Sequence, residues 1–434
     1  MRIQISELLR RVDARLPSGA PDTVFDGGFV DSRDPVEGAL FVGLQGESAD
    51  GGQHAPEALR RGAAAALVGE SAWFWIEGEM QALRKPVIVA DDPLAVLQEA
   101  GRMALEASGA TVVGITGASG KTTTKDILLA MLRAAGARAE GTAGNLNTEI
   151  GVPLTLLGLS EGIGVAVVEM GMRGMGQIAE LARLAPPDVG CITSIGPVHL
   201  ELVGTVEAVA EAKSELLRAL GPGGTAVIPA DEPLLEPHLA SLADGVTVER
   251  FGEEPDVPLD LPWTTAWLRA NAAAALVCCR AVGHAPEPGT RVDVELSALR
   301  GAERPLPGGG VLIEDCYNAN PIAMRAALSD LAGRSGRRVA ILADMFELGD
   351  DEDRYHREVG VVVGELGIDR LIAVGERAAL YAEGADGVES VHIATVEDAA
   401  ERVPDMLAPG DAVLLKGSRG MALERVGAAI AGRE

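Results

Sequence analysis

The 434-residue sequence has few cysteines and no long apolar run. These features argue against a membrane-inserted protein and against one stabilised by disulfides or zinc. No apolar stretch approaches the roughly 20 residues that a membrane-spanning helix needs, so we expect no membrane insertion. Residues 1–11 form an amphipathic start rather than a secretory signal, which predicts a cytoplasmic protein. The cysteines lack CxxC spacing and are expected to be free thiols, neither a disulfide framework nor a zinc site. They are Cys191, Cys278, Cys279 and Cys316.

The sequence is also poor in positive charge. Its 37 Lys and Arg residues are outnumbered by 64 Asp and Glu residues, which gives a net charge of −27 at pH 7. Such a charge argues against nucleic acid and anionic lipid as partners. A content of 47% hydrophobic and 23% charged residues is typical of a globular protein, and the length predicts two or three domains. Any anionic ligand must therefore be bound by local loops against the overall field.

Lysine and asparagine are scarce, and the positions that keep them are informative. A chain that uses Arg for nearly every cation needs a reason to keep Lys, such as a compact ammonium or an amine that can be neutral. The five lysines are Lys85, Lys121, Lys125, Lys213 and Lys416, and the five asparagines are Asn145, Asn147, Asn271, Asn318 and Asn320. Except for Lys85, all of them fall in the motif stretches described below.

The most specific motif is a glycine-rich turn between an apolar run and a helical pattern. Residues 111–116 are typical of a buried strand, and residues 126–132 have the apolar spacing of a helix. Between them, Gly117-x-x-Gly120-Lys121-Thr122 is typical of a phosphate-binding loop, although Ile115 replaces the first glycine of the strict pattern. Backbone N–H groups and a helix N-terminus can surround a polyphosphate, so we favour an ATP site over a simple turn.

Strand and helix patterns alternate along the whole chain, which predicts an α/β fold. Before the phosphate loop, strands are expected at 39–44, 64–68 and 86–90, and helices at 56–62 and 93–107. After it, apolar strands end near Glu169 and at 189–195, and helices are expected at 206–220 and 264–282. The Pro- and Gly-rich segment 286–310 is interpreted as a linker, and strands at 310–315, 339–343, 370–374 and 412–415 follow it.

Several polar residues follow predicted strands, where ligands of parallel sheets gather. Glu169 and His199 are candidate Mg²⁺ ligands beside a polyphosphate, although His199 alone is as consistent with an ordinary loop histidine. Lys213 lies in a helical stretch whose simple interpretation is a solvated surface. The asparagine loop 144–151 is either a turn or a ligand-binding loop. Residues 315–321 and 416–420 carry more acid, amide and cationic groups than a turn requires, so we interpret both as functional.

With these stretches identified, the chain resembles the Mur ligase family of peptidoglycan assembly. Within the family, the asparagine loop and the segment 315–321 favour the member that accepts D-alanyl-D-alanine over those that add single amino acids. The resemblance implies a domain for the UDP-sugar at 1–108, an ATP-binding domain at 109–300 and a Rossmann-like domain at 301–434. The matching stretches are 114–125, 144–155, 169–171, 196–201, 212–215, 315–321 and 416–419.

The resemblance also implies a reaction and its residues. The substrates would be ATP, UDP-N-acetylmuramoyl-tripeptide and D-alanyl-D-alanine, joined through an acyl phosphate, and no general base is assigned. Thr122 and Glu169 would bind one Mg²⁺, and His199 with a carbamylated Lys213 would serve a second. The catalytic residues would be Lys121, Glu169, His199 and Lys213. Residues implied to bind ATP are Gly117, Ala118, Ser119, Gly120, Lys121, Thr122, Thr123, Asn271 and Asp315. Residues implied to bind the other substrates are Ser32, Arg33, Asn145, Asn147, Thr148, Asn318, Asn320, Lys416, Ser418 and Arg419.

Two departures from the family pattern leave alternatives open. Members usually carry His-Asn before the later Asn271, but Trp267 and Leu268 stand there, and the segment near 253–263 is short. How adenine is recognised is therefore open. The alternatives are a related ligase of folylpolyglutamate type with another acceptor, and a catalytically weakened nucleotide-binding member. We expect a monomer, and the third peptide residue, Lys or diaminopimelate, is not determined.

Overall fold

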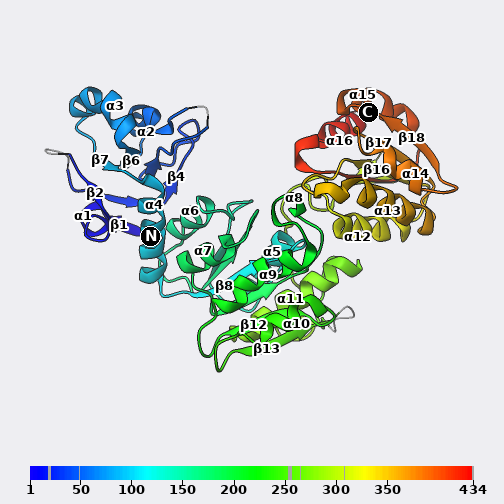
Figure 1. The fold of residues 1–434 in the computed structure, drawn as a ribbon, viewed down its shortest axis with the longest axis horizontal. Helices are drawn as coiled ribbons and strands as arrows, with labels where there is room; N and C mark the ends of the chain where they lie inside the picture. Colours follow the sequence, from blue (N-terminus) through cyan, green and yellow to red (C-terminus); the bar gives the residue numbers. More distant parts are fainter. Residues whose placement is uncertain (18–20, 48, 253–256, 264, 307, 433–434) are drawn as a thin grey trace.

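Three α/β domains follow one another along the chain, each built around its own sheet (Figure 1). The computed structural model describes residues 1–17, 21–47, 49–252, 257–263, 265–306 and 308–432. The first and third domains lie on opposite sides of the central one. This is the α/β, three-domain architecture that the sequence predicts. Among the residues that the structure describes, no helix has the length and apolarity to cross a membrane.

The first domain contains a five-stranded sheet in the order β2-β7-β6-β5-β4, beside an antiparallel pair of β1 and β3. Within the sheet, only the pairing of β2 with β7 is antiparallel. The strands are β1 (Arg2–Gln4), β2 (Ala14–Arg15), β3 (Val24–Asp26), β4 (Gly28–Phe29), β5 (Leu40–Val42), β6 (Ala65–Gly69) and β7 (Val87–Ala90). The helices are α1 (Ile5–Leu8), η1 (Gly51–His54), α2 (Ala55–Arg60), α3 (Glu70–Leu83) and α4 (Pro93–Ser108).

The three strands and two helices expected before the phosphate loop are confirmed as β5, β6, β7, α2 and α4. Helix α3 was not expected. Its buried face carries Trp73, Ile76 and Met80, but the neighbouring Phe74 and Trp75 are exposed and obscure the helical spacing of the apolar residues.

The central domain contains a six-stranded, fully parallel sheet in the order β13-β12-β11-β8-β10-β9. Helices α5 and α11 share one apolar cluster and α6, α7 and α9 another, as expected of a sheet covered on both faces. The strands are β8 (Thr111–Thr116), β9 (Ala139–Gly141), β10 (Val165–Glu169), β11 (Val189–Ile192), β12 (Thr225–Pro229) and β13 (Thr247–Phe251). The helices are α5 (Lys121–Ala134), α6 (Gly151–Leu157), α7 (Gln177–Leu184), α8 (Leu200–Val203), α9 (Val206–Arg218), η2 (Pro233–Leu235), α10 (Glu236–Leu239) and α11 (Ala266–Ala281). The segment near 253–263, noted above as short, includes residues 253–256, which lie outside the described residues.

The third domain has the order β14-β15-β19-β16-β17-β18, parallel except for β14. Its strands are β14 (Ala302–Leu306), β15 (Gly310–Glu314), β16 (Arg338–Ala343), β17 (Arg370–Val374), β18 (Glu389–Ile393) and β19 (Ala412–Lys416). Its helices are α12 (Pro321–Ala332), η3 (Gly349–Asp351), α13 (Glu352–Glu365), α14 (Ala379–Gly384), α15 (Val396–Arg402), η4 (Val403–Met406), η5 (Arg419–Met421) and α16 (Glu424–Ala431).

The interpretation of 286–310 as a linker was wrong for much of that segment. Val292 is buried in the central domain, and the Ser297 N–H donates to Asp126 Oδ2 at 2.9 Å. Residues 302–306 then form β14, the antiparallel edge of the third sheet. A composition rich in Pro, Gly and charge indicates surface position, but it does not exclude pairing with a neighbouring strand.

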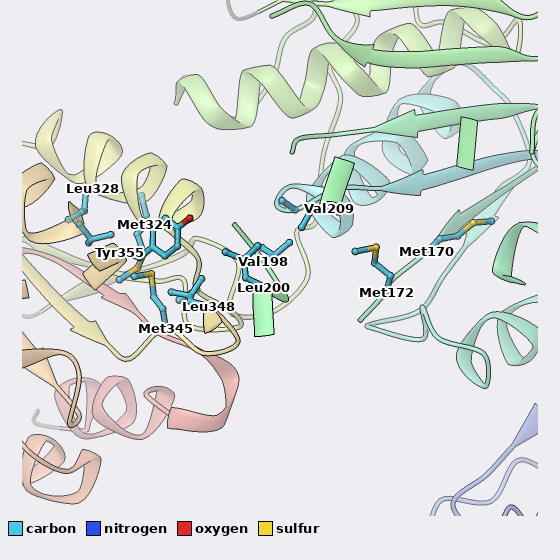
Figure 2. Close-up of a cluster of buried hydrophobic side chains, with 14 of the residues drawn as sticks. Met170, Met172, Val198, Leu200, Val209, Met324, Leu328, Met345, Leu348 and Tyr355 are labelled. Carbon is cyan, nitrogen blue, oxygen red and sulfur yellow. The ribbon is translucent and has the colours of Figure 1, made fainter. Parts of the chain in front are cut away.

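The third domain contacts the central domain through an apolar cluster (Figure 2). Val198, before α8, and Leu200, the first residue of α8, lie next to Leu348 and near Met324 and Tyr355 of the third domain, and all of them are buried. The contact therefore places the loop after β11 against α12 and the loop after β16.

The first domain is joined to the central one mainly through α4. Its Gly101 faces α6, where an added β-carbon would lie 2.8 Å from the Cα of Pro153. The terminal ammonium of Met1 adds polar contacts, since it donates to the carbonyl oxygens of Leu157 and Leu159 at 3.1 and 2.8 Å. Close backbone approach at a glycine thus fixes this joint.

We predict that Gly101→Ala lowers stability and that Gly78→Ala raises it. Both glycines lie inside helices, where Ala is preferred by about 0.5–1 kcal/mol. Gly78 is exposed, with nothing within 4 Å of an added β-carbon, whereas Gly101 abuts Pro153 and overpacking costs about 1–3 kcal/mol. Thermal unfolding midpoints of the two variants measure this difference. A rise for Gly101→Ala equal to that for Gly78→Ala would show that the helices separate without cost.

Candidate functional site

The phosphate loop lies between β8 and α5, where it packs against two other elements at once. An added β-carbon at Gly117 would lie 2.0 Å from Thr193 Oγ1, and one at Gly120 would lie 2.4 Å from Asn271 Oδ1. Gly120 also has a φ of +83°, a conformation that favours glycine. Both glycines of the motif are therefore required by close packing.

The N–H groups of the loop divide into two sets. Those of Ala118 and Ser119 donate to the carbonyl oxygen and the hydroxyl of Ser194, each at 2.9 Å, so they fix the loop to the segment after β11. The N–H groups in the first turn of α5 have no intrahelical acceptor and are suited to bind an anion. Both amides are bonded within the protein in this structure, and the expectation that Ala118 and Ser119 bind ATP stays a prediction.

Lys121 begins α5 and points back over the loop. Its Nζ donates to the carbonyl oxygen of Gly117 at 2.7 Å. Burial lowers the pKa of its ammonium, an effect that the nearby Glu169 carboxylate opposes and the Arg300 guanidinium increases. An incoming polyphosphate would supply the negative charge that this buried cation lacks.

Glu169, the last residue of β10, is an almost fully buried carboxylate at 1% exposure. It accepts hydrogen bonds from Thr122 Oγ1 at 2.8 Å and from Asn147 Nδ2 at 2.7 Å, and its own N–H donates to Thr142 Oγ1 at 2.9 Å. Among the described residues it has no ion pair. Burying a carboxylate without a cation is costly, so the arrangement suits a metal ion.

His199 and Lys213 reach the same region from the loop after β11 and from α9. Lys213 is 1% exposed and, within the described parts of the chain, makes no hydrogen bond or ion pair. Burial, with Lys121 nearby, lowers the pKa of Lys213 well below its usual range, which favours a neutral amine. The simple interpretation of Lys213 as a solvated surface residue was therefore wrong.

These side chains line a cavity of about 630 Å³ that opens between the central and third domains. The third domain contributes Asp315, Asn318, Asn320 and Lys416 to its wall. The expected residues that line it are Ala118, Ser119, Gly120, Lys121, Thr122, Thr123, Asn147, Thr148, Glu169, His199, Lys213, Asp315, Asn318, Asn320 and Lys416.

The polar groups of the third domain are partly engaged with the protein itself. Asn320 caps α12 by accepting from the Ala323 N–H, and its Nδ2 donates to the Ala118 carbonyl oxygen of the phosphate loop at 3.3 Å. Lys416 Nζ donates to Asp315 Oδ2 at 2.6 Å, so the buried ammonium forms an ion pair with a partly buried carboxylate. Lys416 thus positions Asp315 in this structure, and its predicted role as a clamp for a ligand stays a prediction.

Seven expected residues do not line the cavity. Asn271 lies beside it, where its Oδ1 accepts from Thr124 Oγ1 at 3.1 Å and supports the loop at Gly120. Ser32 and Arg33 lie in the first domain, and the Arg33 side chain pairs with Asp31 at 2.7 Å. The others are Gly117, the exposed Asn145, Ser418, which accepts from the Phe346 N–H, and Arg419, which pairs with Glu424.

Sequence reasoning missed several residues of the cavity wall. Arg300 stacks over the Tyr317 ring at 4.0 Å and, among the described residues, has no carboxylate partner. It falls in the segment interpreted as a linker, and no local signal distinguished it. Trp267, noted only as a departure from the family pattern, also lines the cavity and would contact a β-carbon at Gly301.

Comparison of the sequence and the fold with known proteins points to one family. Residues 115–273 match the Mur ligase middle domain, and residues 303–419 match the Mur ligase glutamate ligase domain. The chain is 34% identical over 432 residues to the UDP-N-acetylmuramoyl-tripeptide–D-alanyl-D-alanine ligase of Bacillus subtilis, covering 93% of each chain. A crystal structure of MurF from Acinetobacter baumannii superposes with a TM-score of 0.87 at 26% identity, covering 100% of this chain and 99% of that one. MurF from Thermotoga maritima in complex with ADP gives 0.79 at 26% identity, covering 94% and 97%.

We predict that Gly120→Ala weakens ADP binding at least about tenfold, which corresponds to ~1.4 kcal/mol. The added methyl group collides with Asn271 Oδ1 and displaces the first turn of α5. Gly136→Ala is the matched control, because Gly136 has a similar φ of +81° but open space around an added β-carbon. Calorimetric titration with ADP should separate the two variants. Equal affinities would show that the loop accommodates the added methyl group against Asn271 without loss of ADP binding.

Proposed function

Because the chain belongs to the Mur ligase family, we propose that it joins D-alanyl-D-alanine to UDP-N-acetylmuramoyl-tripeptide at the expense of ATP, in peptidoglycan synthesis. The observation that carries the proposal is the interdomain cavity. There Lys121 and Glu169 of the central domain face Asp315, Asn318 and the other polar groups of the third. This arrangement supports the proposal that the nucleotide and the acceptor meet in one space.

The reaction proceeds in two steps. The terminal carboxylate of the tripeptide attacks the γ-phosphate of ATP, which gives an acyl phosphate and ADP. The free amine of the dipeptide then attacks the acyl carbon, loses a proton, and inorganic phosphate leaves. Positioning and charge neutralisation dominate phosphoryl transfer, and Lys121, Arg300 and the first turn of α5 are placed to supply both.

The residues present fit a Mg²⁺ ion. Within the described ranges, no three His, Cys, Asp or Glu side chains cluster as a complete ligand set. A single buried carboxylate beside a hydroxyl is nevertheless the donor set expected where substrate phosphates and water complete the coordination. Thr122 and Glu169 would hold this ion, and His199 with Lys213 would serve a second. When bound, the metal would neutralise charge on the phosphate oxygens.

Carbamylation of Lys213 would convert its buried amine into the anion that a second cation needs. The unpartnered position of Lys213 and its lowered pKa favour the neutral amine that reacts with CO₂. Arg cannot react in this way, which gives a reason for Lys at this position in an Arg-rich chain.

The remaining substrate contacts rest on the family resemblance. Ser32 and Arg33 of the first domain would contact the UDP end of the precursor. Asn147 and Thr148, with the third-domain wall of the cavity, would contact the peptide and the incoming dipeptide. We further propose that the enzyme is a monomer and works in the cytoplasm, where ATP and UDP-linked precursors are available.

Both alternatives are less well supported. A folylpolyglutamate-type ligase would share the phosphate apparatus, but the match over 93% of the chain favours the dipeptide acceptor. A catalytically weakened nucleotide-binding protein is disfavoured because Lys121, Glu169, His199 and Lys213 line one cavity.

Phosphate release should require all four components of the reaction mixture: ATP, Mg²⁺, UDP-N-acetylmuramoyl-tripeptide and D-alanyl-D-alanine. The measurement is colorimetric phosphate release with each component omitted in turn. Tripeptides ending in Lys and in diaminopimelate are compared as donors, and glutamate replaces the dipeptide as the competing acceptor. Phosphate release that occurs with glutamate as acceptor, and not with D-alanyl-D-alanine, would support the folylpolyglutamate-type alternative. Binding of the tripeptide nucleotide without any release would support the weakened protein.

Lys213→Arg should lower kcat by about 100-fold or more, because a fixed cation replaces the anion that stabilises charge at the site. Wild-type activity should fall in buffer depleted of CO₂ and return on addition of bicarbonate. The Arg variant should not respond to bicarbonate. Unchanged ADP affinity and thermal midpoint would show that the variant is folded. Full activity of Lys213→Arg would contradict carbamylation.

A further inference from the structure

Glu347 reaches from the third domain to two residues of the central domain. It lies in the loop after β16, and its Oε2 contacts His199 Nδ1. Its Oε1 accepts from the Arg173 guanidinium at 3.0 Å. One carboxylate thus joins two central-domain loops to the third domain.

The backbone on both sides of this contact is held in an unfavourable conformation. His199 has a φ of +54° and Glu347 a φ of +63°, and within the described residues only Arg84, Leu299 and Ala422 share this property among non-glycine residues. Such conformations persist where surrounding packing determines them, and they gather at functional sites. His199 and Glu347 both have this conformation and contact each other across the domain boundary, which indicates a constrained junction.

The packing that determines this junction is tight. An added β-carbon at Gly349 would lie 3.3 Å from the backbone of Leu200 and Glu201, and one at Gly196 would lie 2.0 Å from Ile322 Cδ1. Leu348, next to Glu347, packs against Leu200 in the apolar cluster (Figure 2). The position of Glu347 relative to His199 is therefore fixed only when the two domains are docked.

The contact determines which ring nitrogen of His199 remains available. A carboxylate on Nδ1 favours the tautomer with its proton there, which leaves the Nε2 lone pair free. His199 also lines the cavity with Lys213 and Lys121. We propose that Glu347 is a positioning residue that orients His199 toward the ligand cavity when the third domain docks; the inference rests on the proposed ligase function.

Arg173 makes it possible to test the alternative, in which Glu347 only tethers the two domains. The Arg173 side chain is 72% exposed and binds Glu347 Oε1, whereas His199 contacts Oε2, so Arg173 can tether the domains but does not itself contact the imidazole. If Glu347 acted only as a tether, removal of either partner would have the same effect. If Glu347 positions His199, removal of Glu347 alone affects the metal-dependent step.

The experiment compares Glu347→Gln, Glu347→Ala and Arg173→Ala, with Glu365→Gln as a control for charge on an exposed face of the third domain. Phosphate release gives kcat and the KM for ATP, and electron paramagnetic resonance with ADP present gives Mn²⁺ affinity. Loss of a group that orients a metal-binding His typically costs about 10–100-fold. We expect both Glu347 variants to lose that much in kcat and Mn²⁺ affinity with little change in KM. Glu365→Gln should stay within about twofold of wild type in all three quantities. Arg173→Ala, whose side chain also lines the cavity, should keep its Mn²⁺ affinity within about twofold of wild type.

Two results would overturn the inference. The first is Mn²⁺ affinity and kcat in Glu347→Ala equal to those of Glu365→Gln. The second is an equal loss of Mn²⁺ affinity in Arg173→Ala, which would make the carboxylate a tether. Thermal midpoints exclude unfolding as the cause. A wild-type chain that binds Mn²⁺ and ADP but releases no phosphate would contradict the proposed function, while the Mn²⁺ comparison among variants would still test Glu347.

Discussion

The close approach of the phosphate loop to its neighbours is the constraint on which the rest of the site depends. Gly117 and Gly120 leave no room for a β-carbon against Thr193 and Asn271. Because the loop is held between the segment after β11 and helix α11, the start of α5 has one position. That position delivers the hydroxyl of Thr122 to the carboxylate of Glu169.

The charge balance at the site differs from that of the whole chain. The protein carries a net charge of −27, yet the cavity is lined by cationic side chains such as Lys121, Lys213 and Arg300 as well as by carboxylates. Burial disfavours the charged forms of Lys121 and Lys213, and an anion bound beside them would favour those forms again. Local desolvation therefore acts at this site in addition to the overall field.

The third domain completes the cavity through a contact of limited extent. Val198 and Leu200 supply apolar burial, while Asn320 and Glu347 supply polar contacts to the phosphate loop and to His199. Contacts between domains of one chain commonly permit relative motion. Such a contact suits an enzyme that must admit three substrates and release its products.

The sequence by itself determined the α/β class and the glycine-rich loop before helix α5, and it identified Glu169 and Lys213 as candidate site residues. These follow from spacing along one segment and from the scarcity of Lys, which need no knowledge of distant residues. It did not reveal β14, helix α3, the role of Arg300 or the ion pair of Lys416 with Asp315.

Only the tertiary structure decided which groups meet. Asn147 reaches Glu169 across 22 residues of chain, Lys416 reaches Asp315 across 101, and Glu347 reaches His199 across 148. Ser32 and Arg33 instead lie in the first domain, outside the cavity wall. Local patterns specify each element, but the distance between side chains on different elements depends on how sheets and domains pack, which no local pattern contains.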